Sequence, residues 1–266
     1  MNNFKSTIIL TILCLIGVVS GVSAEEITIV GTGSGTTILE AVGNAFSHQN
    51  PGITISVPPS IGSGGGIKAV GRDENLLGRV AREIQEKEEP YGLTYVAYAK
   101  EPIVFYVNKS VTVKDLSAQQ ILDIYSGKIS NWKEVSGEDA GIRVVTREEG
   151  DSSLSVLLDL FPGFQDITIT SRAKTTFSDP ETEETVLNTT DTIAYGSYPN
   201  VKAIDVNVVT IDGKGATDND YPYVGILGFV YKEANYSGNI KRFVEFATSE
   251  TVHEVIKEAG GIPITK

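Results

Sequence analysis

The sequence holds little of the chemistry on which enzymes and metal sites depend. Its 266 residues include one cysteine, Cys14, and two histidines, His48 and His253. One cysteine cannot close a disulfide within the chain, and these three side chains lack the spacing of a metal site. Both histidines lie in segments with helical spacing, away from the motifs described below. We therefore expect no metal, no cofactor and no catalytic residue, and the fold must be stabilised by its hydrophobic cores.

Positive charge is also scarce. The chain has 22 lysines and arginines against 34 aspartates and glutamates, a net charge of −12. This balance argues against nucleic acid and against anionic membrane surfaces as partners. It does not exclude a small anionic ligand, because distant surface charge is screened within about 10 Å while local dipoles act at contact.

Long hydrophobic runs are missing except for one at residues 8–19. Lys5 precedes this run, and the small residues Val22, Ser23 and Ala24 follow it. The pattern is typical of a secretory signal peptide, so we expect residues 1–24 to direct export to the periplasm or the extracytoplasmic cell surface. The alternative is an uncleaved N-terminal anchor. No later apolar stretch is long enough to span a bilayer.

Glycine, serine and threonine, in contrast, gather in three motifs at residues 31–37, 61–68 and 147–154. We name them the first, second and third cradle. Each comes just before a segment with helical apolar spacing. A small-residue turn that opens a helix presents backbone N–H groups and the positive end of the helix dipole to an anion. Three such motifs in one chain suggest one small oxyanion held from several sides.

Hydrophobic periodicity predicts alternating strands and helices. We expect strands at 26–30, 53–57, 93–99, 103–107, 142–146 and 223–231, and helices at 37–49, 67–70, 116–125, 154–161, 180–187, 240–247 and 252–259. This order predicts an α/β protein with mostly parallel sheets. The charged run at 83–90 is predicted to be a solvated face or a linker.

The same residues carry a family resemblance over nearly all of the chain after residue 24. The most specific phrase is Tyr-Ser-Gly-Lys-Ile-Ser-Asn-Trp, which falls within residues 124–134, and the other carriers are 31–37, 61–68, 77–82, 100–108 and 147–153. The chain resembles the phosphate-binding receptors of ABC transporters, in the type II periplasmic-binding-protein superfamily. The resemblance implies two α/β lobes with the ligand cleft between them, one lobe at 25–101 and 222–266 and the other at 102–221. It also implies inorganic phosphate and an ABC transporter permease as partners, and a monomer.

The cradles and the resemblance together give the candidate ligand-binding residues Ser34, Gly35, Thr36, Thr37, Ser63, Arg82, Arg147, Asp151, Ser152 and Ser153. The family has its arginine at Arg147, whose planar guanidinium fits two oxygens of a tetrahedral anion. The alternative is a surface arginine paired with Glu148 or Glu149. Ser63 matches a phosphate-binding serine of the family. Arg82 matches an arginine of many relatives and would reach the anion or brace the cleft.

The remaining basic residues near the cradles are expected at the surface. Arg72 and Arg79 are predicted to be surface residues, and Lys68 is predicted to be solvated on its helix.

Asp151 departs from the family pattern, which commonly has a serine there and an aspartate at about the place of Ala81. A carboxylate repels a bound anion unless the anion brings a proton to donate. Hydrogen phosphate brings one and sulfate at neutral pH does not, so Asp151 could be a relocated selectivity filter. Equally, it could be an N-cap that points at its own helix.

Other functions compete with phosphate capture. Sulfate, molybdate and tungstate are alternative ligands, and the same fold could serve as a ligand-sensing signalling module. A phosphoester hydrolase is disfavoured, because no general base is evident near Ser152 or Ser63. A dinucleotide site at the first cradle is disfavoured because no acidic residue follows the strand at 53–57.

Overall fold

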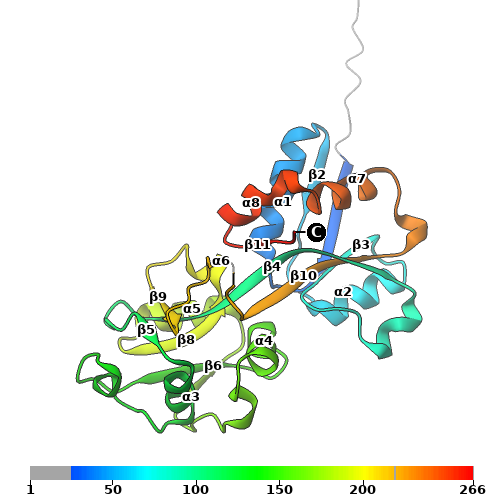
Figure 1. Cartoon of the computed structure of the whole chain (residues 1–266). Helices are drawn as coiled ribbons and strands as arrows, with labels where there is room; N and C mark the ends of the chain where they lie inside the picture. Colours follow the sequence, from blue (N-terminus) through cyan, green and yellow to red (C-terminus); the bar gives the residue numbers. More distant parts are fainter. Residues whose placement is uncertain (1–24, 219, 266) are drawn as a thin grey trace, which may run out of the picture.

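The computed structural model describes residues 25–218 and 220–265, so the predicted signal peptide and Cys14 lie outside the described residues. The chain forms two α/β bodies joined by two long strands, β4 (Thr94–Val107) and β10 (Val224–Tyr231) (Figure 1). Among the described residues, no helix is both long and apolar enough to cross a membrane.

The first body is built from the two ends of the described chain. It contains β1 (Glu25–Gly31), α1 (Thr36–Gln49), β2 (Ile53–Ser56), α2 (Gly62–Gly71), β3 (Leu77–Val80), α7 (Gly238–Ala247), α8 (His253–Glu258) and β11 (Ile262–Pro263). The second body contains β5 (Asp115–Leu116), α3 (Ala118–Ser126), β6 (Arg143–Arg147), α4 (Ser152–Leu160), β7 (Lys174–Thr176), α5 (Asp179–Asn188), β8 (Thr192–Ser197), α6 (Tyr198–Val201) and β9 (Asn207–Ile211).

The strands form one continuous path in the order β2-β1-β3-β10-β4-β8-β6-β7. Neighbours within each body, such as β1 with β3 and β6 with β8, pair in parallel. Both joining strands run antiparallel to every strand that they pair with. The sheet is therefore mixed, and the expectation of mostly parallel sheets is wrong, because β4 leaves the first body and β10 returns to it.

The two strands predicted at 93–99 and 103–107 are one continuous strand, β4. Pro102 lies within it, opposite Val224 at the end of the pairing with β10. Proline has no N–H to donate, and it is tolerated at the point where the ladder changes partner. Ile103 resumes the hydrogen bonding with an N–H donated to the Tyr223 carbonyl at 2.8 Å.

Each body has its own main hydrophobic core. The residues of one core fall between 27 and 99 or between 227 and 256, and the residues of the other fall between 103 and 223. The predicted two-lobed α/β fold is thereby confirmed. The exact lobe boundaries, at 101/102 and 221/222, stay a prediction.

The second cradle differs from its predicted local structure. The periodicity placed a helix start at residue 67, but α2 begins at Gly62, so the glycine run is itself helical. A Cβ on Gly66 would lie 2.8 Å from the Gly31 Cα and 3.0 Å from the Val30 carbonyl oxygen. Glycine is required there because the helix lies directly against β1. The cradle is thus a helix end packed closely on a strand end.

One expectation about a charged residue is wrong, and another fails at a single position. Arg79, expected at the surface, is 2% exposed, and its guanidinium donates to the carbonyl oxygens of Thr32 at 2.6 Å, Pro58 at 2.7 Å and Ile29. Backbone carbonyls thus satisfy the buried cation. The charged run at 83–90 is mostly exposed, as expected, but Glu88 within it is buried and pairs with Arg82.

Candidate functional site

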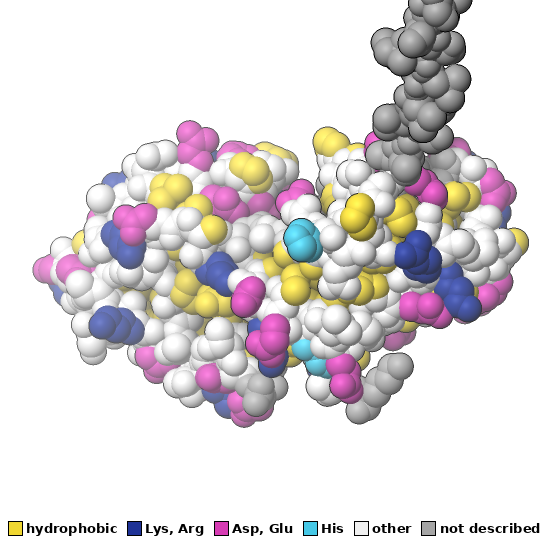
Figure 2. Space-filling model, turned by 90° about the horizontal axis from the view of Figure 1, so that it is seen from above, with side chains coloured by type: hydrophobic (Ala, Val, Ile, Leu, Met, Phe, Trp, Pro, Cys, Tyr) yellow, Lys and Arg dark blue, Asp and Glu magenta, His cyan; other side chains and the backbone are white. Residues whose placement is uncertain are grey.

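The cleft between the two bodies is a cavity of about 910 Å³ lined by all three cradles. Its walls hold Ser34 and Ser63 from the first body and Arg147, Asp151 and Ser152 from the second. The space-filling view shows a groove between the two bodies (Figure 2). The starts of α2 and α4 and the turn before α1 therefore meet at one place, where backbone N–H groups could surround a small anion.

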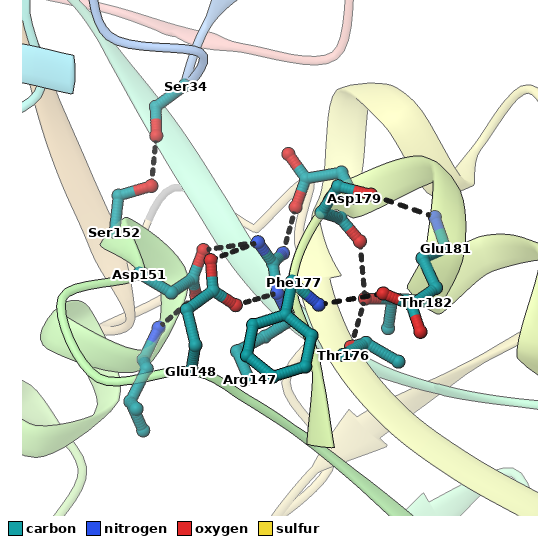
Figure 3. A network of polar contacts seen from close by, with 12 residues as sticks. Ser34, Arg147, Glu148, Asp151, Ser152, Thr176, Phe177, Asp179, Glu181 and Thr182 are labelled. Carbon is teal, nitrogen blue, oxygen red and sulfur yellow. Dashed lines mark hydrogen bonds and ion pairs between the residues drawn. The ribbon is translucent and has the colours of Figure 1, made fainter. Parts of the chain in front are cut away.

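Arg147 is the most heavily engaged side chain of the cleft. It ends β6, and its side chain is 6% exposed. Its Nε lies 3.1 Å from Glu148 Oε2, its Nη2 lies 3.0 Å from Asp151 Oδ2, and its Nη1 pairs with Asp179 (Figure 3). Burial lowers the pKa of Arg147, but its hydrogen bond to Glu148 and the charges of Asp151 and Asp179 outweigh that effect and raise the pKa above its ordinary value. The site is therefore a permanent cation ringed by three carboxylates.

Asp151 combines two roles. It is the N-cap of α4, where its Oδ1 accepts the Leu154 N–H at 2.8 Å. Its other carboxylate oxygen faces Arg147, and the residue is 8% exposed. Burial raises the pKa of Asp151 to about 6 although Arg147 and the Leu154 N–H oppose this rise. The capping interpretation is correct, and it leaves Asp151 in the cleft wall where an anion would meet it.

The serines of the cleft make hydrogen bonds between the two bodies and within the first body. The Ser34 hydroxyl contacts the Ser152 hydroxyl directly across the cleft (Figure 3). Ser63, in the first turn of α2, accepts the Ala81 N–H at 3.1 Å. The three hydroxyls can each still offer a proton or a lone pair to a ligand.

Four of the predicted site residues do not line the cavity. The Gly35 N–H donates to Glu101 at 2.8 Å, and the Thr36 hydroxyl donates to the Gly33 carbonyl at 2.7 Å. The Thr37 hydroxyl donates to Asn200 Oδ1 at 3.0 Å, and Ser153 is buried within α4. Their polar groups are engaged within the protein and do not line the cavity.

Arg82 lines the cleft from the first body. Its guanidinium makes a bidentate pair with Glu88, with nitrogen–oxygen distances of 2.7 and 2.8 Å. The Arg82 hydrogen bond holds the pKa of Glu88 below its ordinary value. The guanidinium is fixed at the rim, which fits the bracing role considered for it.

Sequence reasoning named Glu148 only as a partner of a surface arginine, and it did not single out Phe177 and Asp179 in the cleft or Glu101 beneath it. Glu148, Phe177 and Asp179 line the cavity, and Phe177 is 70% exposed there. Glu101 lies behind the first cradle, 3% exposed, and accepts hydrogen bonds from Gly35 and from the Ser197 hydroxyl at 2.6 Å. Local signals existed for Asp179-Pro180, at the start of a predicted helix, and for Glu148, inside the third cradle.

Comparison with known proteins assigns the chain to a superfamily. A family model described as a PBP superfamily domain matches residues 19–251. The chain belongs to the PBP superfamily. This PBP chain is 25% identical over 251 residues to the phosphate-binding protein PstS of Bacillus subtilis (strain 168), covering 91% of the chain and 82% of PstS.

Solved structures of similar proteins share this fold. A Clostridium perfringens protein, assigned as a phosphate ABC transporter substrate-binding protein and solved with bound phosphate, is 28% identical with a TM-score of 0.77. The match covers 91% of this chain and 100% of that one. An ABC-type phosphate transport receptor from Vibrio cholerae shares the fold, with a TM-score of 0.65 at 24% identity, covering 90% of this chain and 100% of that one.

Proposed function

We propose that this protein is an exported receptor that captures inorganic phosphate and delivers it to an ABC importer. The observation that carries the proposal is the meeting of all three cradles, with the buried Arg147, in a single interlobe cleft. The bound phosphate of the Clostridium perfringens relative and the name of the Bacillus subtilis relative support the choice of anion.

The proposed ligand contacts come from both lobes. Ser34 and Ser63 offer hydroxyls from the lobe at 25–101 and 222–266, and Ser152 offers one from the lobe at 102–221. Arg147 supplies the charge, and Asp151 accepts a proton that hydrogen phosphate carries. Gly35, Thr36, Thr37 and Ser153 contribute the helix starts behind these groups, and Arg82 braces the rim.

The receptor works by closure rather than by turnover. Contacts already run between the lobes at Ser34 with Ser152 and at Thr37 with Asn200. Hinge closure around a ligand is usual for two-lobed receptors. The cavity wall, as described, contains no histidine or cysteine that could act as base or nucleophile. We therefore expect the receptor to bind phosphate and release it unchanged.

The proposal is tested by equilibrium dialysis of the ligand-stripped protein against labelled inorganic phosphate. A phosphoester is offered in a parallel incubation. We expect saturable retention of one phosphate per chain that excess molybdate and tungstate do not displace, and no hydrolysis of the ester. Tight retention of another oxyanion, without retention of phosphate, would contradict the assignment of phosphate as the ligand. Hydrolysis of the ester would contradict the assignment of the protein as a binding protein.

A further inference from the structure

Carboxylates occupy both hydrogen-bonding edges of the Arg147 guanidinium. Glu148 takes the edge formed by Nε and Nη2, at 3.1 Å and 3.4 Å from its two carboxylate oxygens. Asp179 on Nη1 and Asp151 on Nη2 take the other edge. A phosphate that uses the planar fork of Arg147 must therefore replace one of the chain's own carboxylates.

The three carboxylates are not equally replaceable. Asp151 is held by the Leu154 N–H, and its side chain is 6% exposed. Asp179 shares its edge with Asp151 and begins α5. Glu148 holds a complete edge alone, its side chain is 29% exposed, and in the described chain its recorded side-chain contacts are those with Arg147. Its main chain is anchored by an N–H donated to the Thr176 carbonyl at 3.2 Å. The Glu148 carboxylate can therefore rotate into solvent while the cradle stays in place.

We propose that Glu148 is an internal competitor for the Arg147 fork and sets the affinity of the cleft. Phosphate and the Glu148 carboxylate both place two oxygens on the Nε–Nη2 edge, so binding of one excludes the other. The form in which Glu148 has turned away is the binding-competent one, and the apparent affinity is reduced by the fraction of chains that adopt it. The inference rests on the proposed capture of phosphate.

The chain offers a matched control in the next residue. Glu149 carries the same charge and is exposed, and within residues 25–218 and 220–265 it is Glu148, not Glu149, that pairs with Arg147. Glu148→Gln and Glu149→Gln therefore remove the same charge one residue apart, and only the first removes a contact with Arg147. Glu149 is exposed and outside the cavity lining, so solvent and salt screen its charge more than that of Glu148. Glu148→Asp is a third variant for the comparison, because it keeps the charge on a side chain that is one methylene shorter.

The experiment is a calorimetric titration of the wild type and the three variants with inorganic phosphate. We expect Glu148→Gln to bind about fivefold more tightly or better, which is the size of one partly exposed ion pair. Glu149→Gln should stay within about twofold of the wild type. Glu148→Asp should tighten binding in the same direction as Glu148→Gln. A phosphate-bound structure should show the Glu148 carboxylate more than about 4 Å from the guanidinium, beyond ion-pair distance.

Each contrary result identifies what has failed. Equal effects of Glu148→Gln and Glu149→Gln would overturn the competition, because charge alone would then explain both. Weaker binding in Glu148→Gln would also overturn it, because Glu148 would then orient Arg147. If the wild type and every variant fail to bind phosphate, the proposed function fails and the inference falls with it.

Discussion

At the scale of single residues, the cleft is unusual for an anion site because acids outnumber the base at its centre. Arg147 carries three carboxylate partners, so this cluster has no net positive charge to offer. Attraction of an anion must come from helix N-termini and hydroxyl groups, and from protons that the ligand itself donates. Such a site favours a protonated anion over one that has lost all its protons.

Arg147→Ala should weaken phosphate binding by roughly 2–5 kcal/mol, the range for removing one partner of a buried charge pair. The three carboxylates would remain without their cation and repel the ligand. Lys68→Ala is the control, since Lys68 is exposed on α2 and outside the cavity lining. Titration calorimetry of both variants measures the difference, and comparable losses would show that the cleft is placed wrongly.

Asp151→Asn should lower the phosphate-to-sulfate affinity ratio by at least about tenfold, or roughly 1.4 kcal/mol. Asparagine still caps α4, so the helix is kept while the charge that repels a fully deprotonated anion is lost. Because the pKa of Asp151 is raised to about 6, the wild-type ratio should also shrink as the pH falls through that value. In the asparagine variant this pH dependence should be absent. An unchanged ratio would mean that Asp151 is only a cap.

At the scale of elements, the cradles depend on how closely helices approach strand ends. α2 begins with five successive small residues, and the glycines among them have different surroundings. A Cβ on Gly66 would lie 2.8 Å from the Gly31 Cα, whereas a Cβ on Gly64 would meet only the Glu88 and Arg82 side chains at 3.7 and 3.8 Å.

This difference predicts opposite effects of one substitution at two sites of the same helix. Gly66→Ala should destabilise the fold by about 1–3 kcal/mol, because the backbone of β1 cannot move away. Gly64→Ala should stabilise it by about 0.5–1 kcal/mol, because alanine is the better helix former. Urea unfolding of the two variants gives the comparison. Equal destabilisation by both would show that the glycines of α2 are not distinguished by packing.

The elements also show which features the sequence can predict. The cradles were found because a helix start with small residues is a local pattern, and α4 indeed begins at such a motif. The helical glycine run was missed because glycine lowers helix propensity, and only packing on β1 overrides that preference. Arg79 was misplaced for a similar reason. The carbonyls that satisfy it come from two segments, the end of β1 at Ile29 and Thr32 and the turn at Pro58, which no local pattern brings together.

At the scale of the whole molecule, Glu101 connects the two lobes beneath the cleft. It lies on β4, and one carboxylate oxygen accepts the Gly35 N–H from one lobe and the Ser197 hydroxyl from the other. Burial raises the pKa of Glu101 to about 7, well above the ordinary value for a glutamate. The folded chain therefore holds this proton more tightly than the unfolded chain does.

The stability contributed by this proton is complete below about pH 4.5 and is lost as the pH rises through about 7. The loss amounts to roughly 2–4 kcal/mol for a shift of this size. Glu101→Gln should remove that part of the pH dependence, and Glu40→Gln, at an exposed position of α1, should not. Urea unfolding at pH 4.5 and pH 8 tests this. A Glu101→Gln variant that loses as much stability as the wild type across that range would contradict it.

The central claim is that the interlobe cleft is a phosphate site, and one calorimetric titration of the ligand-stripped protein tests it most directly. Inorganic phosphate is titrated first, and sulfate is titrated into a second sample under the same conditions. The account predicts that each chain binds one phosphate with a Kd of about 1 μM or below. This Kd corresponds to a binding free energy of about −8 kcal/mol or more negative. It predicts sulfate binding at least about tenfold weaker. Sulfate binding as tight as phosphate, or no phosphate binding at all, would contradict it.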